Sequence, residues 1–382
     1  MFRIVEKQVR LDFPRGHHLH GLVGQIPNHL GGAGFACKQT DPAGQWEQIR
    51  SIFELVAQGS GNLKKLHFLF LPEVAVPAAR VREALEFIGR NFRPNTVTLF
   101  GVEHITLAEY RQVLEGDQAD NAEALASVCE DLEAGDIAGI PVNWAVTAIK
   151  EADGRLRIFL QAKSHPFGGE ETIEPAHDLY RGKVFPLFRS HPTGFNFMAV
   201  ICLDYIYRDL YQSNISAIID HANQLYFQTR QGLDLLAVLQ CNPKPEHSAF
   251  RDVVNGFYGE YLAYTPGVRD TITVFCNSSA QTSGLPIKGE ASFGHSSVVI
   301  HRSHKLAAEA QAEFRTDDFD GLPVCRLRFG RETRLYLFNL PVFHELDPRT
   351  TRAPLKIHSI FRPDDSAGWV RVSEAEPAGN RY

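Results

Sequence analysis

The chain has 382 residues, of which 44% are hydrophobic and 22% are charged, and its formal net charge at pH 7 is -6. These values predict a large globular core and give no electrostatic reason to bind nucleic acid or an anionic membrane, whose phosphates require clustered Lys and Arg. The first residues, MFRIVEKQVRLDF, are too charged for a signal peptide or a membrane anchor. No later apolar run reaches the roughly 18 residues of a spanning helix.

Six cysteines are scattered along the chain without a CxxC pair, which predicts reduced thiols in a cytoplasmic protein. The segment PRGHHLH at residues 14–20 contains three histidines, and imidazoles are good ligands for transition metals. No carboxylate or cysteine cluster accompanies these histidines, so we interpret them as polar loop residues and expect no metal site.

The first half of the chain alternates between predicted strands and helices. A short strand is expected at residues 21–26, and a helix at 46–57 has one apolar stripe. The apolar strand at 66–71 runs into Pro72 and Glu73. A helix beginning at Pro77 and a strand at 96–100 follow. A carboxylate therefore ends a buried strand.

The middle of the chain places a lysine and a cysteine at strand ends in the same way. Residues 107–140 are acidic and polar, and we interpret them as an inserted helix pair or lid. Strands at 142–149 and 156–160 form a predicted hairpin that runs into Lys163. After a loop at 164–190, the apolar run FNFMAVICLD ends at Cys202 and Asp204.

The remaining elements are one helix and several apolar strands. The helix is expected at 213–230, and its apolar residues exceed what a solvated helix needs. Strands are predicted at 235–239, 271–275, 297–300, 324–329 and 334–338. The polar tail after Pro363 is expected to fray.

In this order, the three strand ends resemble the nitrilase, or carbon-nitrogen hydrolase, superfamily. The resemblance is carried by LPE at residues 71–73, KSHPFGGE at 163–170 and ICLD at 201–204. Weaker matches are VGQ at 23–25, Gly101, Asn277 and GHS at 294–296. The match covers about residues 20–340, and several weak motifs in the correct order are more specific than any one alone.

The resemblance implies a four-layer α-β-β-α sandwich. We expect one domain at 1–362, with inserted segments at about 107–140 and 205–230, and a polar tail at 363–382. It also implies an amidase-like enzyme that needs no metal or organic cofactor, takes a small-molecule amide and assembles as a homodimer or a larger homo-oligomer. Alternatives are acyl transfer to an amine, or a scaffold module that binds a protein partner through the inserted segments.

The resemblance also assigns roles to residues. Cys202 is the expected nucleophile, Glu73 the general base and acid, and Lys163 the group that stabilises the oxyanion. A second glutamate follows the lysine in many members; Glu171 has the commonest spacing, and Glu170 and Glu174 compete with it.

Four residues near the strand ends are candidate substrate contacts: Leu203, Tyr205, Cys241 and Asn242. For Tyr205 packing is an equal alternative, and Cys241 and Asn242 have the alternative of ordinary loop residues. Asp204 is expected to form a turn rather than to act in catalysis. Leu203 stands where the family has an aromatic or acidic residue, so the pocket should differ and amides are expected in preference to nitriles.

Overall fold

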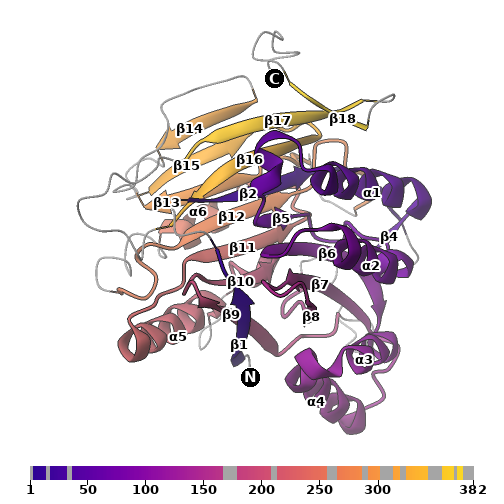
Figure 1. The fold of residues 1–382 in the computed structure, drawn as a ribbon. Helices are drawn as coiled ribbons and strands as arrows, with labels where there is room; N and C mark the ends of the chain where they lie inside the picture. The colour runs from indigo at the N-terminus through magenta and orange to yellow at the C-terminus, as the bar shows by residue number, and fades with distance from the viewer. Residues whose placement is uncertain are drawn as a thin grey trace.

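The computed structural model describes residues 3–13, 18–31, 37–166, 179–207, 213–255, 265–285, 291–301, 313–318, 324–342, 355–364 and 368–372. Within them, two eight-stranded mixed sheets stack on each other, with helices α1 to α4 on one outer side and α5 on the other (Figure 1). This is the four-layer α-β-β-α sandwich that the sequence resemblance implied. None of the described helices is long and apolar enough to cross a membrane.

Sheet A has the strand order β1-β9-β10-β11-β12-β13-β15-β14. Its strands are β1 (Arg3–Leu11), β9 (Val184–Pro192), β10 (Asn196–Ile201), β11 (Leu235–Gln240), β12 (Ile272–Asn277), β13 (Ser297–His301), β14 (Phe314–Asp318) and β15 (Val324–Phe329). The three central strands β10, β11 and β12 are parallel, so their carboxyl ends lie at one edge of the sheet.

Sheet B has the order β18-β17-β16-β2-β5-β6-β7-β8. Its strands are β2 (His18–Gln25), β5 (Phe68–Phe70), β6 (Thr96–Thr106), β7 (Pro141–Lys150), β8 (Leu156–Ala162), β16 (Arg334–Pro341), β17 (Ile357–Asp364) and β18 (Gly368–Arg371). Strands β2, β5 and β6 are parallel, and the remaining pairs are antiparallel. A separate pair consists of β3 (Leu30–Gly31) and β4 (Lys38–Gln39).

The helices are α1 (Pro42–Gln58), α2 (Val81–Asn91), α3 (Leu107–Gly116), α4 (Gln118–Ala134), α5 (Asn214–Thr229) and α6 (Ser248–Asn255). Short 3₁₀ turns occur at Gly61–Lys65, Ala78–Arg80 and Cys202–Asp204. Helix α1 begins where the Asp41 side chain accepts a hydrogen bond from the Gly44 N–H, and it ends at Gly59 with φ +58°. Both are ordinary start and stop signals, because Asp caps the first turn and glycine tolerates a left-handed end.

The core follows the two faces of sheet B. Leu19 and Val23 belong to the cluster between the sheets, whereas Leu22 belongs to the cluster beneath the helices, as the alternation of side chains along a strand requires. Aromatic rings cross the gap between the sheets: Phe68 of β5 meets Phe197 of β10 edge to face, with ring centroids 5.3 Å apart. This packing fixes the two sheets relative to each other.

The segment 107–140 is the expected helix pair, but it forms part of the outer layer rather than a lid. Tyr110 packs on Trp144 of β7, and the Asn121 side chain bonds the backbone of β8 on both sides, donating to the Ile158 carbonyl and accepting from the Leu160 N–H. Helix α4 thereby packs onto β8, the strand that ends sheet B. Sparse apolar residues suffice here because buried amide groups complete the contact.

Five strands of the two large sheets were not predicted from the sequence, namely β1, β9, β14, β17 and β18, and neither was the short pair β3 and β4. Strand β1 pairs in parallel with β9, although most of β9 was interpreted as a loop and no element was assigned to residues 3–11. The antiparallel strands β17 and β18 form one edge of sheet B, so the expected frayed tail is wrong for residues 363–364 and 368–371; residues 365–367 and 373–382 lie outside the described range. Strand β1, with the sequence RIVEKQVRL, has no apolar run longer than two residues and so lacks the signal that marks the buried strands.

Candidate active site

Glu73 lies just beyond the carboxyl end of β5, in a backbone segment held against β6. The Gly101 N–H donates to the Pro72 carbonyl at 3.0 Å, and the Val76 N–H donates to the Gly101 carbonyl at 3.0 Å. A Cβ atom at Gly101 would stand 2.4 Å from the Glu73 Cα. Only glycine therefore allows this close approach, which positions the carboxylate.

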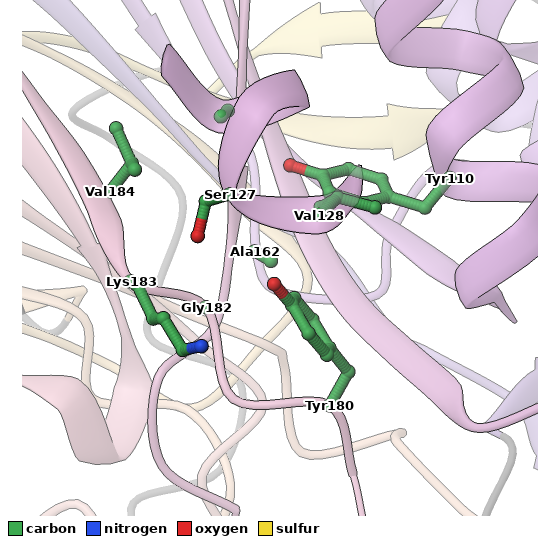
Figure 2. A pocket seen from close by; sticks show the side chains of 9 residues that line it. Tyr110, Ser127, Val128, Ala162, Tyr180, Gly182, Lys183 and Val184 are labelled. Atoms are coloured by element: carbon green, nitrogen blue, oxygen red, sulfur yellow. The ribbon is translucent and has the colours of Figure 1, made fainter. Parts of the chain in front are cut away.

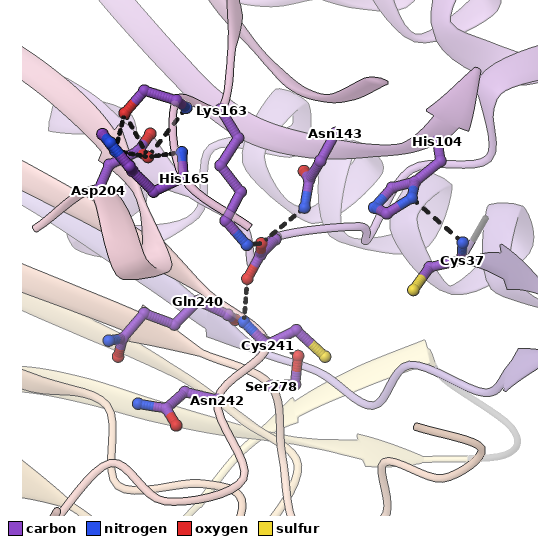
Figure 3. A network of polar contacts seen from close by, with 12 residues as sticks. Cys37, His104, Asn143, Lys163, His165, Asp204, Gln240, Cys241, Asn242 and Ser278 are labelled. Carbon is purple, nitrogen blue, oxygen red and sulfur yellow. Dashed lines mark hydrogen bonds and ion pairs between the residues drawn. The ribbon is translucent and has the colours of Figure 1, made fainter. Parts of the chain in front are cut away.

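Three donors from three elements converge on the Glu73 carboxylate (Figure 3). Oxygen Oε1 accepts from Asn143 Nδ2 at 2.8 Å and from Lys163 Nζ at 2.8 Å. Oxygen Oε2 accepts from the backbone N–H of Cys241 at 2.9 Å. Asn143 lies on β7 and Lys163 follows β8, both strands of sheet B, whereas Cys241 follows β11 of sheet A, so the carboxylate joins the two sheets.

This ion pair is almost fully removed from water. Glu73 is 4% exposed and Lys163 is 0% exposed. Burial of two charges is costly, and their attraction offsets the cost only where further hydrogen bonds satisfy both groups. Such a buried, hydrogen-bonded charge pair at strand ends is typical of a functional site, although structural pairs of this kind also occur.

Cys202 follows β10 directly and begins a 3₁₀ turn with φ +44°. A non-glycine residue at positive φ is strained, and such strain concentrates at active sites. Strands β10 and β11 are parallel, with Ile201 aligned to Leu239. Cys202 is therefore level with Gln240, one residue before the Cys241 N–H that binds Glu73.

Asp204 ties the turn after Cys202 to the loop after Lys163 (Figure 3). Its Oδ1 accepts from the Ser164 N–H at 2.9 Å, the Ser164 hydroxyl at 2.8 Å and the His165 N–H at 2.9 Å. Asn214 at the start of α5 donates to the Asp204 carbonyl at 2.9 Å. Asp204 thus holds two candidate catalytic segments together through its side chain.

Cys241 contributes its backbone rather than its thiol. Burial, and to a smaller extent the Glu73 carboxylate, raise the pKa of the Cys241 thiol to about 12. Asn28 donates to this sulfur at 3.5 Å, to the Glu73 carbonyl at 2.9 Å and to the Ser278 hydroxyl at 2.8 Å. A thiol in this setting stays protonated and cannot compete as a nucleophile.

The other expected substrate contacts lie in different environments. Tyr205 has no exposed surface and packs edge to face on Phe275, with centroids 5.1 Å apart, so packing describes it better than pocket lining. Leu203 is partly buried against the same core. The Asn242 N–H donates to Asn277 Oδ1 at 2.8 Å, and its buried Nδ2 has no hydrogen-bond partner among the described residues. Glu170, Glu171 and Glu174 lie outside the described residues.

A small cavity lies beneath α4, lined by Tyr110, Ser127, Tyr180, Lys183 and neighbouring residues (Figure 2). Its volume of about 10 Å³ suffices for at most one water molecule. The Tyr180 hydroxyl donates to Asp131 at 2.8 Å, and Lys183 pairs with the same carboxylate. This cavity is a structural feature and cannot hold a substrate.

The sequence analysis missed Asn143 and Asn28, which support Glu73 from two sides. Asn143 interrupts the apolar strand PVNWAVTAIK and is completely buried. An amide inside such a run needs a buried partner, and this is the signal that marks it in the sequence. Asn28 follows a strand among turn residues, where asparagine is common, so its sequence context carries no such signal.

No protein-family model matches the sequence, and no curated protein matches it. Among solved structures, the chain is similar to a cysteine-to-alanine mutant of Nesterenkonia AN1 amidase from the nitrilase superfamily. The match covers 86% of this chain and 93% of that chain, with a TM-score of 0.48 and 14% sequence identity.

Proposed function

We propose that the protein is a thiol hydrolase of the nitrilase type that cleaves a non-peptide C–N bond, with amides preferred to nitriles. The observation that carries the proposal is the buried carboxylate of Glu73. It accepts hydrogen bonds from Lys163 and from the N–H of Cys241, which lies one residue beyond the position level with Cys202 on the neighbouring strand. A base, a cation and a strained cysteine are the three groups that thiol acylation requires.

In the first half-reaction, Glu73 accepts the Cys202 thiol proton while the sulfur attacks the amide carbonyl carbon. The oxygen becomes an oxyanion that the Lys163 ammonium and the Leu203 N–H stabilise. The tetrahedral intermediate collapses, the C–N bond breaks, and Glu73 returns the proton to the departing nitrogen. The products are a thioester on Cys202 and free ammonia or an amine.

In the second half-reaction, Glu73 takes a proton from water, and the resulting hydroxide attacks the thioester carbonyl. The C–S bond then breaks, the carboxylic acid leaves, and the proton on Glu73 returns to the sulfur. One carboxylate thus serves both steps, which the hydrogen bonds from Asn143 and the Cys241 N–H favour by fixing its orientation. An amine that replaces water would give acyl transfer instead.

The decisive experiment is intact-protein and peptide mass spectrometry after incubation with a mixed amide library. We expect an acyl adduct on Cys202 of the parent protein and none on Cys202→Ala. Matched amide and nitrile substrates, followed by ammonia release, then test the preference. An adduct on another cysteine, or faster turnover of the nitrile, would contradict the proposal.

A homodimer stays a prediction. The apolar residues of α5, which suggested it, no longer support it. Ile215, Ile218, Ile219 and Leu225 of α5 are buried within the chain's own core, so they offer no surface for a partner. Phe227, at 68% exposure, is the only large hydrophobic residue exposed among the described residues. Light scattering at micromolar concentration tests the assembly, and a strictly monomeric mass would contradict it.

A further inference from the structure

Three histidines from two strands meet on sheet B, at the end away from Glu73. His18 and His20 lie on β2 and His358 lies on β17, and one ring nitrogen of each lies within 4.8 Å of the others. Strand β2 is parallel to β5, which leads to Glu73 at its carboxyl end, whereas His18 and His20 stand at the amino end of β2. The cluster is thus separate from the candidate active site.

The sequence pattern at residues 14–20 predicted that its histidines lie in a polar loop. The structure corrects this prediction for His18 and His20. His18 and His20 are two residues apart on a strand and therefore point to the same face of the sheet. His20 is 5% exposed, and its ring centroid lies 5.1 Å from that of His18 and 5.2 Å from that of His358. His17 lies outside the described residues.

A β-bulge brings His358 to this face. Strand β16 pairs with β17 through Leu337 with Ser359 and through Phe338 with Ile357, so His358 is the extra residue at the register shift. Bulges of this kind redirect a side chain that regular pairing would point elsewhere. The irregularity thus lies at the one position of β17 that completes the histidine cluster.

Two of the three rings have a buried nitrogen without a hydrogen-bond partner in the described part of the chain. The buried atoms His20 Nδ1 and His358 Nε2 have no hydrogen-bond partner among the described residues. Buried ring nitrogens normally find a partner, so two in one cluster point to a bound group. Neutral imidazole is the form that binds metals.

We propose that His18, His20 and His358 bind one transition-metal ion, with Zn²⁺ the best fit and the fourth position open to water or an anion. Tetrahedral Zn²⁺ with Zn–N bonds of about 2.0–2.1 Å needs nitrogens about 3.4 Å apart, which small ring rotations achieve from separations below 4.8 Å. Lys65, Lys356 and Arg93 lie close to the cluster, so an anionic fourth ligand is favoured over a neutral one.

Such an ion would join β2 to β17 across the intervening β16 and so fasten the edge hairpin to the centre of sheet B. Metal ions that bind only the folded state stabilise it by mass action. The role proposed is therefore structural, and it does not depend on the chemistry at Cys202.

The test uses full-length, untagged, metal-stripped protein titrated with ZnCl₂ by calorimetry, with thermal unfolding measured in parallel. We expect one Zn²⁺ per chain and a higher Tm, and CoCl₂ in place of ZnCl₂ should give the visible absorption of a tetrahedral site. His358→Gln should weaken binding by roughly 100-fold or more, since loss of even a supporting contact costs about 10–100-fold. His221→Gln, on α5 and remote from the cluster, is the matched control.

Unchanged Zn²⁺ affinity in both His358→Gln and His18→Gln would overturn the proposal, because ions held by thiols elsewhere survive these changes. Absence of saturable binding to the parent protein would overturn it as well. If the buried His20→Gln variant fails to fold, the two partly exposed positions still decide the matter. Neither result bears on acylation of Cys202, so this proposal and the proposed function fail separately.

Discussion

The turns after β10 and β11 lie side by side at one edge of sheet A, and each begins with a buried cysteine. At the first turn, Cys202 has a strained backbone, and Asp204 ties the turn to the loop after Lys163. At the second, Cys241 has its thiol beside the Asn28 amide and donates its N–H to Glu73.

The comparison teaches that a strand end alone does not make a cysteine reactive. Burial, and to a smaller extent the Glu73 carboxylate, raise the pKa of the Cys241 thiol, although the Lys163 charge acts in the opposite direction, so a nearby base and cation alone do not ionise a buried thiol. The positive φ of Cys202 distinguishes its turn from the turn at Cys241. The proposed division is that one cysteine reacts and its neighbour orients the base.

The largest expected effect comes from removing each thiol in turn. Cys202→Ala should lower turnover by about 10⁴-fold or more, as loss of a nucleophile does. Cys241→Ala should stay within about tenfold of the parent protein, because the backbone N–H to Glu73 remains. Ammonia release measures both, with circular dichroism to confirm folding. A larger loss of turnover in Cys241→Ala than in Cys202→Ala would indicate that Cys241 is the nucleophile.

A smaller effect is expected from neutralising the carboxylate that both turns serve. Glu73→Gln should lower turnover by about 10²-fold with substrate affinity nearly intact, the usual scale for loss of general acid-base help. Lys163→Ala should cost at least as much, since it removes an oxyanion donor. Exposed Glu47→Gln on α1 is the matched control. Amide turnover unaffected by Glu73→Gln would rule out this mechanism.

Adding a charge next to the base sharpens the comparison further. Asn143→Asp places a second carboxylate at hydrogen-bond distance from Glu73 Oε1, so the pKa of the coupled pair should rise. The acidic limb of the pH profile of kcat/KM should then move upward by about one unit. Asn91→Asp, at the exposed end of α2, should leave the limb in place. If the acidic limb of the pH profile does not move in Asn143→Asp, Glu73 is not the group whose ionisation controls the rate.

Thiol labelling gives the smallest but most direct contrast. With iodoacetamide between pH 7 and 9, Cys202 should label several times faster than any other cysteine. Cys241, with a pKa near 12, is about 0.1% thiolate at pH 9 and should react only when urea unfolds the chain. Peptide mapping identifies the labelled sites. Earlier labelling of Cys241 or Cys37 under native conditions would remove Cys202 from the nucleophile's role.

Most of the fold, and the positions of Glu73, Lys163 and Cys202 just after strands, were predictable from the sequence because the strands are apolar; the catalytic roles of the three residues stay predictions. Long apolar runs identify β5, β10 and β11, and Glu73 and Cys202 are the first polar or reactive groups after such runs. Strands β1 and β17 were missed because neither has an apolar run longer than two residues, which is the signal that marks the buried strands.

Contacts that depend on tertiary packing were not predictable. From the sequence, Cys241 is notable for its thiol. In the structure its backbone N–H donates a hydrogen bond to Glu73 across the gap between the sheets. The histidine cluster is similar: His358 follows His20 by more than three hundred residues, and only the pairing of β2 with β16 and of β16 with β17 brings them together. Local sequence patterns do not reveal contacts between residues so far apart in the sequence.

The interleaving of the two sheets has a consequence for folding during synthesis. Strand β1 belongs to sheet A and β2 to sheet B, and β2 pairs with β16, so that His18 faces Pro341. Neither sheet can close until most of the chain has left the ribosome, and such long-range pairing folds slowly. Until β16 has been synthesised, β2 can pair with β5 on one side only, and its other side has no partner strand. We therefore expect nascent chains that end before β16 to need chaperone protection, whereas chains that include it can bury the strand.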